Sequence, residues 1–224
     1  MYQIVADEAD FMVISKMADV HFHSQDGHPG VMAQLEADLA IKLYSVHRLD
    51  SMTSGLLIFA KSAHTAAIFT QMFSQHQVQK YYLALASGKP KKKQGAVIGD
   101  MAKARRSMHK LLRSKNNPAI TQFFSQSVAP SLRLYLLKPL SGKTHQIRVA
   151  LASLGVPILG DRLYGGAQAD RGYLHAYALS FVYNQQRFDY FCPPTQGEFF
   201  TGEEIKNQLQ TWSNPEKLAW PKQK

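Results

Sequence analysis

Residues 46–60, VHRLDSMTSGLLIFA, join a dense polar segment directly to a short apolar run. The run at Leu56–Ala60 is bounded by polar residues, which is typical of a buried strand. A polar loop beside a core strand is a common place for functional side chains. Asp50, Thr53 and Ser54 are equally suited to satisfy the backbone of a turn, which is the usual role of such residues. The segment alone therefore predicts a strand and leaves the role of Asp50 open.

Apolar periodicity predicts further elements on both sides of this segment. The helix expected at Lys61–Gln77 has a stripe of Ile68, Phe69, Met72 and Phe73, spaced by three and four residues. Strands are predicted at Phe11–Ser15, Tyr81–Ala86, Ala119–Val128, Leu132–Lys138 and Leu174–Tyr183, with a hairpin between the third and fourth, and helices at Thr144–Ser153 and Glu203–Trp212. Adjacent strands mixed with a few helices indicate an α+β fold.

The helix at residues 144–153 has recognisable sequence limits. Thr144 is expected to cap its start, and Gly155 to end it. Strand alternation at Tyr81–Ala86 puts Tyr81 and Tyr82 on opposite faces, so we expect one ring in the core and one in a cleft. A cleft-facing ring could stack on a base, although cross-strand packing is its commoner role.

Length and composition indicate a globular protein. The 224 residues are 45% hydrophobic, which is enough for a sizeable core, and we expect one domain over residues 1–224, which could comprise two lobes. Cys192 is the only cysteine, so an intrachain disulfide and a multi-cysteine zinc site are excluded, and a structural thiol in a reducing cytoplasm is expected. Neither an export signal nor a membrane-spanning run is indicated.

Positive charge is concentrated in one stretch. The chain has 26 Lys and Arg against 16 Asp and Glu, a formal net charge of +10, and residues 80–115 hold eleven of these bases and a single acid, Asp100. The excess favours a polyanionic partner, with nucleic acid first and an anionic membrane second, although a solvated loop would look the same. Within this stretch, Ser87–Gly95 is expected to be an exposed turn that could separate two lobes.

Two other candidate sites are not supported by the sequence. Gly-Lys-Thr at residues 142–144 lacks the earlier glycine of a phosphate-binding loop, because Leu137 occupies that position. His21, His23 and His28 lie close together, but no neighbouring acid or cysteine completes a ligand pattern. A nucleotide hydrolase is therefore disfavoured, and no metal site is predicted.

Taken in order, five motifs resemble those of the RluA-type pseudouridine synthases. They are His-Arg-Leu-Asp at 47–50, Thr-Ser-Gly at 53–55, Lys-x-Tyr at 80–82, Thr-His-Gln-Ile-Arg at 144–148 and Gly-Asp-x-x-Tyr-Gly at 160–165. The likeness runs from about Ile4 to the Leu-His-Ala segment at 174–176, nearly the whole catalytic domain of that family. It implies a mixed, mainly antiparallel sheet with flanking helices, divided by a central catalytic cleft.

The resemblance also implies an activity, the isomerisation of a uridine already in RNA without cofactor or metal. The N1–C1′ bond breaks and the uracil is rejoined through C5. By motif position, Asp50 is the catalytic aspartate, Tyr82 packs against the base, Arg148 pairs with Asp50, and Ile147 lines an apolar pocket. A carboxylate held ionised by an arginine is a competent nucleophile or base. A covalent adduct and a glycal route both stay open, as do stacking and proton removal by Tyr82.

The expected partner is a structured RNA, ribosomal or transfer, bound by a cytoplasmic monomer away from any membrane. The phosphate contacts predicted are Lys89, Lys91, Lys92, Lys93, Arg105 and Arg106, with Arg48 and Lys80 nearer the cleft. Two positions depart from the family pattern: Lys143 replaces the usual arginine, which affects substrate contacts, and Ala150 replaces a histidine. No appended RNA-binding domain is expected. The alternative is a non-catalytic RNA-binding or chaperone protein that has kept the fold.

Overall fold

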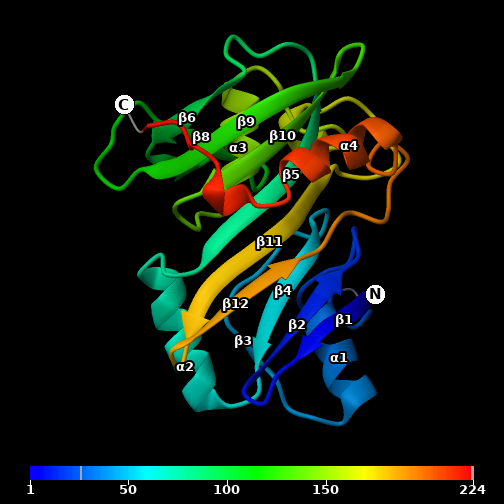
Figure 1. The fold of residues 1–224 in the computed structure, drawn as a ribbon, viewed down its shortest axis with the longest axis vertical. Coiled ribbons are helices and arrows are strands. Elements are labelled where there is room, and N and C mark those ends of the chain that lie inside the picture. Colours follow the sequence, from blue (N-terminus) through cyan, green and yellow to red (C-terminus); the bar gives the residue numbers. More distant parts are fainter. Residues whose placement is uncertain (26, 223–224) are drawn as a thin grey trace.

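A computed structural model describes residues 1–25 and 27–222, and a ten-stranded sheet runs through them (Figure 1). The strand order is β1-β2-β4-β11-β5-β10-β9-β6, with β12 paired to β11 and β3 to β4. The strands are β1 (Tyr2–Asp7), β2 (Phe11–Lys16), β3 (Tyr44–Ser45), β4 (Ser54–Ala60), β5 (Gln79–Ser87), β6 (Gln94–Gly99), β9 (Ala119–Ala129), β10 (Leu132–Pro139), β11 (Leu174–Tyr183) and β12 (Gln186–Phe191). A separate hairpin pairs β7 (Met101–Lys103) with β8 (His109–Leu111).

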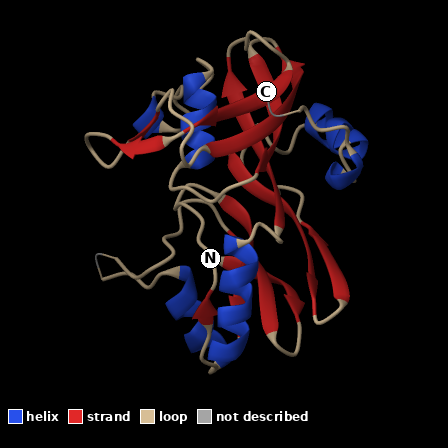
Figure 2. Ribbon diagram, turned by 90° about the vertical axis from the view of Figure 1, so that its left-hand side faces the viewer, coloured by secondary structure: helices blue, strands red, loops and turns tan. Residues whose placement is uncertain are grey.

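The helices lie on both faces of this sheet. They are α1 (Val31–Leu39), α2 (Ala63–Ser74), α3 (Gln146–Ser153) and α4 (Glu203–Thr211), with short 3-10 turns at Arg162–Tyr164 and Pro215–Lys217. Seen from the side, α1, α2 and α3 lie on one face and α4 on the other (Figure 2). In the described part of the chain, no helix is long and apolar enough to cross a membrane.

The sheet is mainly antiparallel, which confirms the α+β class. The exception is the pairing of β4 with β11, which is parallel and involves Ser54 with His175 and Gly55 with Ala176. The predicted hairpin is present, because β9 and β10 pair antiparallel along nearly their whole length. The start of β4, which follows the polar segment, is therefore joined to β11 by one short parallel contact.

Buried side chains form two hydrophobic clusters. The first packs β2, β4 and α2 and includes Phe11, Phe59, Phe69 and Met72, so the stripe predicted for α2 does face the core. The second packs β5, β9, β10 and α3. Strand β11 contributes to both clusters, and the first lies in the lower part of Figure 1 and the second in the upper part. β11 is therefore the element that joins the two halves.

The basic stretch contains more regular structure than expected. β6 begins at Gln94, inside the predicted turn, because residues 94–99 pair with β9 and bury Val97. The turn also joins two strands of the same hydrophobic cluster. β7 and β8 form a hairpin that local periodicity did not reveal. In these places tertiary pairing overrides a charged, turn-rich sequence.

The start of α3 differs from the prediction. Thr144 does not cap the helix, which begins at Gln146 after His145 adopts a left-handed conformation with φ 56°. The Gln146 side chain organises the turn instead: its Oε1 accepts from the backbone N–H of Lys143 at 3.0 Å, and its Nε2 donates to the Ile120 carbonyl at 3.0 Å. A buried amide tied to a neighbouring strand replaces an exposed hydroxyl cap.

Candidate active site

Arg148 joins two carboxylates at the edge of a cleft. Its Nη1 donates to Oδ2 of Asp50 at 3.1 Å, while Nε and Nη2 donate to the two oxygens of Asp161 at 2.7 and 2.8 Å. Arg148 is 7% exposed and Asp161 1%, whereas the Asp50 side chain is 29% exposed. The arrangement fixes the guanidinium through a buried acid and leaves the other acid accessible.

The electrostatics of this group favour full ionisation. Burial alone would lower the pKa of Arg148, but the hydrogen bonds and charge of Asp161, with the charge of Asp50, raise it above its ordinary value. Asp161 belongs to the Gly-Asp-x-x-Tyr-Gly motif at 160–165, but the sequence predicted no role for it. The buried ion pair with Arg148, thirteen residues earlier, is a tertiary contact that the sequence does not display.

The loop before β4 holds Asp50 by its backbone. Its carbonyl accepts from the Thr53 N–H at 3.0 Å, and among the described residues its carboxylate is hydrogen-bonded by Arg148. His47 supports the same loop, because its Nε2 accepts from the Ile58 N–H at 2.9 Å. Burial lowers the pKa of His47 to about 3, which keeps the ring neutral and able to accept. The backbone of Asp50 thus serves the turn while its side chain faces the cleft.

A second polar chain approaches Asp50 from α3. Nε2 of His145 lies 3.9 Å from Oδ2 of Asp50, and its Nδ1 lies 2.9 Å from the Tyr164 hydroxyl. That hydroxyl accepts from the His109 N–H at 2.8 Å and is left to donate to His145. Burial lowers the pKa of His145, so the neutral ring turns an Nε2–H toward Asp50. Neither His145 nor Tyr164 was assigned a role from sequence.

The cleft beside these groups has a volume of about 1080 Å³. Tyr82 of β5 and Ile147 of α3 both line it, as expected, together with Leu174. Tyr81 points the other way, is 1% exposed and packs 5.8 Å from the Trp220 ring, which confirms the predicted split of the two tyrosines. Burial and the charge of Asp50 raise the pKa of Tyr82, so its hydroxyl stays protonated at neutral pH.

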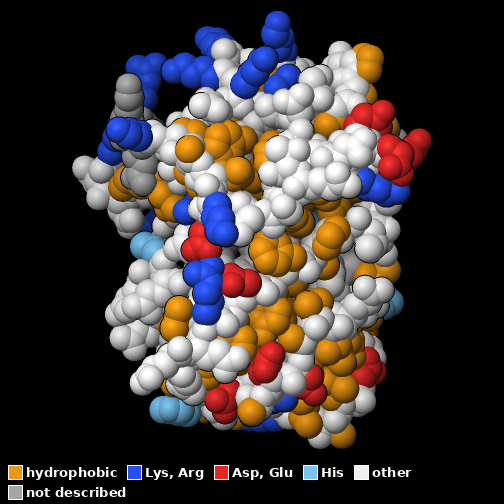
Figure 3. Space-filling view, viewed as in Figure 1, with side chains coloured by type: hydrophobic (Ala, Val, Ile, Leu, Met, Phe, Trp, Pro, Cys, Tyr) orange, Lys and Arg blue, Asp and Glu red, His pale blue; other side chains and the backbone are white. Residues whose placement is uncertain are grey.

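The predicted RNA-contact residues fall into two groups. Arg48, Lys80 and Lys143 line the cleft, and Lys143 donates to Oδ1 of Asn117 at 3.1 Å. The others are exposed in the β5–β6 turn and the β7–β8 hairpin, outside the cleft lining, and are called the basic rim below: Lys89, Lys91, Lys92, Lys93, Arg105 and Arg106. Lys and Arg side chains gather at the upper end of the molecule in Figure 3, where these elements lie.

Two residue types singled out from sequence lie away from this chemistry. Cys192 is half-buried, its thiol donates to Ser15 Oγ at 3.2 Å, and burial raises its pKa, as suits a structural thiol. His21, His23 and His28 do not line the cleft. Across residues 1–25 and 27–222, His, Cys, Asp and Glu side chains form no group of three or more suited to a metal ion.

Comparison with known proteins shows the family of this chain. A family model described as RNA pseudouridylate synthase matches residues 10–153, a span that contains Asp50, Tyr82 and Arg148. The chain belongs to the RNA pseudouridine synthase family. Enzymes of this family are isomerases that act on RNA. The RluA-type resemblance of the five motifs is thereby confirmed at the level of the family.

Individual relatives support the same assignment. An uncharacterized RNA pseudouridine synthase of Haemophilus influenzae is 47% identical over 213 residues, covering 94% of this chain and 95% of the relative. The dual-specificity RNA pseudouridine synthase RluA of Escherichia coli K12 is 30% identical over 192 residues, covering 80% and 86%. The solved human RNA pseudouridylate synthase domain containing 1 has the same fold, with TM-score 0.77 at 23% identity over 100% of this chain and 97% of its own.

Proposed function

We propose that this chain converts specific uridines in structured ribosomal or transfer RNA to pseudouridine, with Asp50 as the reacting carboxylate. The observation that carries the proposal is the Asp50–Arg148–Asp161 arrangement, an accessible acid held by an arginine that a buried acid holds in turn. An ionised, oriented carboxylate in a cleft is what attack on C1′, or removal of the adjacent proton, requires.

In the reaction, the N1–C1′ bond breaks, the uracil turns over, C5 bonds to C1′, the C5 proton leaves, and N1 gains a proton. Asp50 either forms a temporary ester at C1′ or assists elimination to a glycal, and Arg148 favours its charged form in both routes. Nε2 of His145, 3.9 Å from Oδ2 of Asp50, supplies a further N–H beside the reacting carboxylate.

Tyr82 is assigned to hold the base. Its raised pKa keeps it a phenol, which is a poor proton acceptor, and its ring lines the cleft beside Ile147 and Leu174. A uracil between an aromatic ring and aliphatic side chains would be held by stacking while it turns. The late proton removal from C5 then belongs to another group or to water.

RNA binding requires that the uridine leave its helix or loop stack. The cleft volume of about 1080 Å³ suits an extruded nucleotide, and extrusion costs a few kcal/mol. We expect the Lys and Arg side chains of the basic rim to contact neighbouring phosphates, since they are exposed and lie outside the cleft lining. Affinity should therefore fall steeply as salt rises.

A non-catalytic RNA-binding role is the second candidate, favoured by the basic rim. Mutation separates the two. Wild type and Asp50→Asn are compared for pseudouridine formed in total RNA from cells lacking the protein, since asparagine keeps the size of the side chain and removes its charge. We expect a defined set of sites that needs Asp50. Product from Asp50→Asn, or no product from wild type, contradicts the proposal.

A further inference from the structure

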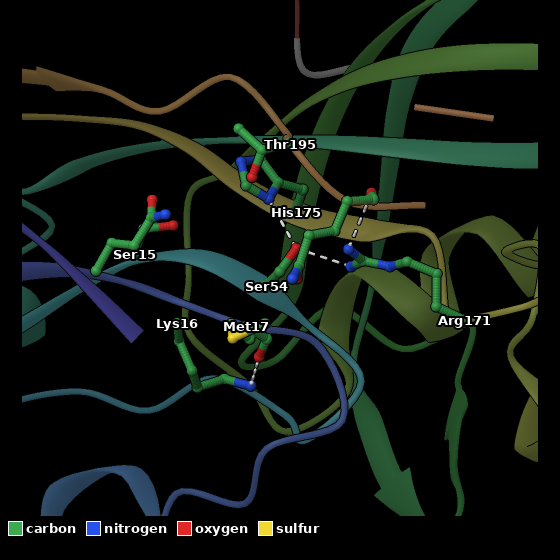
Figure 4. A pocket seen from close by; sticks show the side chains of 9 residues that line it. Ser15, Lys16, Met17, Ser54, Arg171, His175 and Thr195 are labelled. Carbon is green, nitrogen blue, oxygen red and sulfur yellow. Dashed lines mark hydrogen bonds between the residues drawn. The ribbon is translucent and has the colours of Figure 1, made fainter. Parts of the chain in front are cut away.

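A chain of short hydrogen bonds is buried at the start of β4, among residues that do not line the cleft (Figure 4). Nη2 of Arg171 donates to Oγ of Ser54 at 2.7 Å, and Oγ of Ser54 lies 2.7 Å from Nδ1 of His175. Nε2 of His175 lies 2.6 Å from the carbonyl oxygen of Cys192. Ser54, Arg171 and His175 are 4%, 7% and 3% exposed. None of them lines the cleft, and no catalytic step described above uses them.

The partners fix the protonation of this chain. The Cys192 carbonyl accepts only, so Nε2 of His175 carries the proton and Nδ1 accepts from the Ser54 hydroxyl. Ser54 thus donates to His175 and accepts from Arg171. Burial lowers the pKa of His175 to about 4, with the nearby charge of Arg171 adding to the effect, in keeping with a neutral ring. Every member of the chain therefore has a defined direction.

The hydrogen bonds of Ser54, Arg171 and His175 lie where the two halves of the molecule meet. Ser54 is the first residue of β4 and comes four residues after Asp50, and it pairs with His175 in the short parallel contact between β4 and β11. The two strands approach closely there, since a Cβ on Gly55 would lie 2.3 Å from the Ala176 carbonyl oxygen. The position of Asp50 relative to the other half thus depends on this junction.

Arg171 also contacts the segment that carries the other acid. A Cβ on Gly160 would lie 1.8 Å from the Arg171 carbonyl oxygen, so the backbone beside Asp161 rests directly on Arg171. Other N–H groups of Arg171 donate to the carbonyls of Gly172, Gln196 and Leu174, at 3.0, 3.3 and 3.3 Å. Arg171 is therefore linked to the Asp50 loop by its side-chain hydrogen bond to Ser54, and to the Asp161 turn by its backbone.

The charges around the chain do not point to a ligand. A cavity of about 50 Å³ adjoins it, and Lys16 also lines that cavity. Lys16 gives its three N–H groups to the carbonyls of Met17, Val20 and Ser51, at 2.8, 2.8 and 3.0 Å. Burial lowers the pKa of both Lys16 and Arg171, and nearby acids partly offset this effect. These acids are Asp19 and Asp50 for Lys16, and Asp19 and Asp170 for Arg171. Since most of these donors bind backbone carbonyls, the cluster is suited to support the backbone.

We propose that Ser54, Arg171 and His175 are positioning residues for the Asp50–Arg148 pair, setting the distance between the two halves of the active site without touching the RNA. The inference rests on the proposed function, because the carboxylate it positions is the reacting group. Misplacing a reacting atom by about 1 Å can cost a hundredfold in rate. Loss of the chain should therefore lower kcat and leave RNA binding intact.

The first test is Ser54→Ala, which removes both central hydrogen bonds. We expect kcat for pseudouridine formation to fall by about a hundredfold, while the RNA Kd stays within twofold. The matched control is Ser125→Ala, because Ser125 is also buried and accepts from a buried arginine, Arg133, on β9 and β10, outside the cleft lining. The control should keep kcat. A folded Ser54→Ala enzyme with wild-type kcat overturns the proposal, as does an equal loss in the control.

A second pair of variants separates positioning from general stability. Asparagine at 175 keeps an acceptor near the place of Nδ1, and glutamine keeps a donor near the place of Nε2, so His175→Asn retains the link to Ser54 and His175→Gln the link to Cys192. We expect similar losses in Tm but a kcat at least tenfold higher for His175→Asn. Equal kcat in both variants, or the reverse order, overturns the proposal.

The two proposals fail in different ways. If wild type forms pseudouridine and Asp50→Asn does not, yet the Ser54 and His175 variants are fully active, only the positioning role is wrong. If wild type forms no pseudouridine, the proposed function is wrong and the positioning role falls with it.

Discussion

Positive charge is held in two different ways at the cleft and at the basic rim. Arg148 is buried and gives N–H groups to two carboxylates. The six Lys and Arg residues of the rim are exposed, and within the described residues none of them forms an ion pair. The effect of a buried charge held in fixed geometry depends on the shape of its side chain. The effect of exposed charges depends mainly on their number and is screened by salt. The cleft should therefore control kcat and the rim control affinity.

The largest effect is expected where the arginine geometry is lost. Arg148→Lys keeps the charge, but a single ammonium group cannot contact Asp50 and both oxygens of Asp161. We expect kcat to fall by about a thousandfold with little change in RNA Kd, measured by single-turnover pseudouridine formation. Arg133→Lys, at a buried arginine outside the cleft lining, is the control. A kcat within tenfold of wild type would show that charge alone suffices.

Asp161→Asn tests the buried acid that holds the arginine. The variant leaves a less charged partner for Arg148, and we expect kcat to fall about a hundredfold together with a clear drop in Tm. Asp189→Asn breaks an exposed ion pair with Arg187 and should change either quantity little. Wild-type kcat in Asp161→Asn would mean that Asp50 alone orients Arg148.

Two variants of Tyr82 separate the contribution of its ring from that of its hydroxyl. Tyr82→Ala removes the stacking surface, whereas Tyr82→Phe keeps it, so the alanine variant should be about tenfold or more slower than the phenylalanine variant. The comparison is made at saturating RNA, where binding does not limit the rate. Equal rates for the two variants would shift the role of Tyr82 from its ring to its hydroxyl.

The basic rim should change affinity alone. Replacing Lys91, Lys92 and Lys93 by glutamine is expected to weaken RNA binding about tenfold at low salt and to reduce the slope of log Kd against log salt by about one per lost contact. The kcat should not change. Glutamine at Lys42, Lys206 and Lys217, exposed lysines outside this stretch, is the control for net charge. A lower kcat in the rim variant would place the rim in the chemistry.

The last expected effect is on stability rather than on rate or affinity, and it depends on pH. Burial lowers the pKa of His47 to about 3 and of His175 to about 4, from an ordinary 6.5, so both are neutral in the native state. Their contribution to stability is complete above about pH 7 and declines as pH falls from there toward 4, by up to about 1.4 kcal/mol per pH unit for each. Tm should fall over this range, less steeply in His175→Asn. An unchanged slope in that variant would contradict the neutral assignment.

Sequence by itself determined the elements that local pattern specifies. The strands at β2, β4, β5, β9, β10 and β11, the helix α2 and the α+β class followed from apolar periodicity and turn residues, which act over a few positions. The motif order gave Asp50, Tyr82 and Arg148 together, and all three meet at the cleft. Their catalytic roles remain predictions until the variants are measured.

Tertiary structure alone decided the rest, because distant segments had to meet. Asp161 meets Arg148 in an ion pair buried in the fold. Ser54 meets His175 in a strand contact and Arg171 in a hydrogen bond, although both partners are more than a hundred positions away in the sequence. β6 was not predicted, and the start of α3 was predicted too early, because both depend on hydrogen bonds to the distant strand β9. The sequence specifies the type of each side chain, but tertiary packing determines which partner it contacts and therefore which role it has.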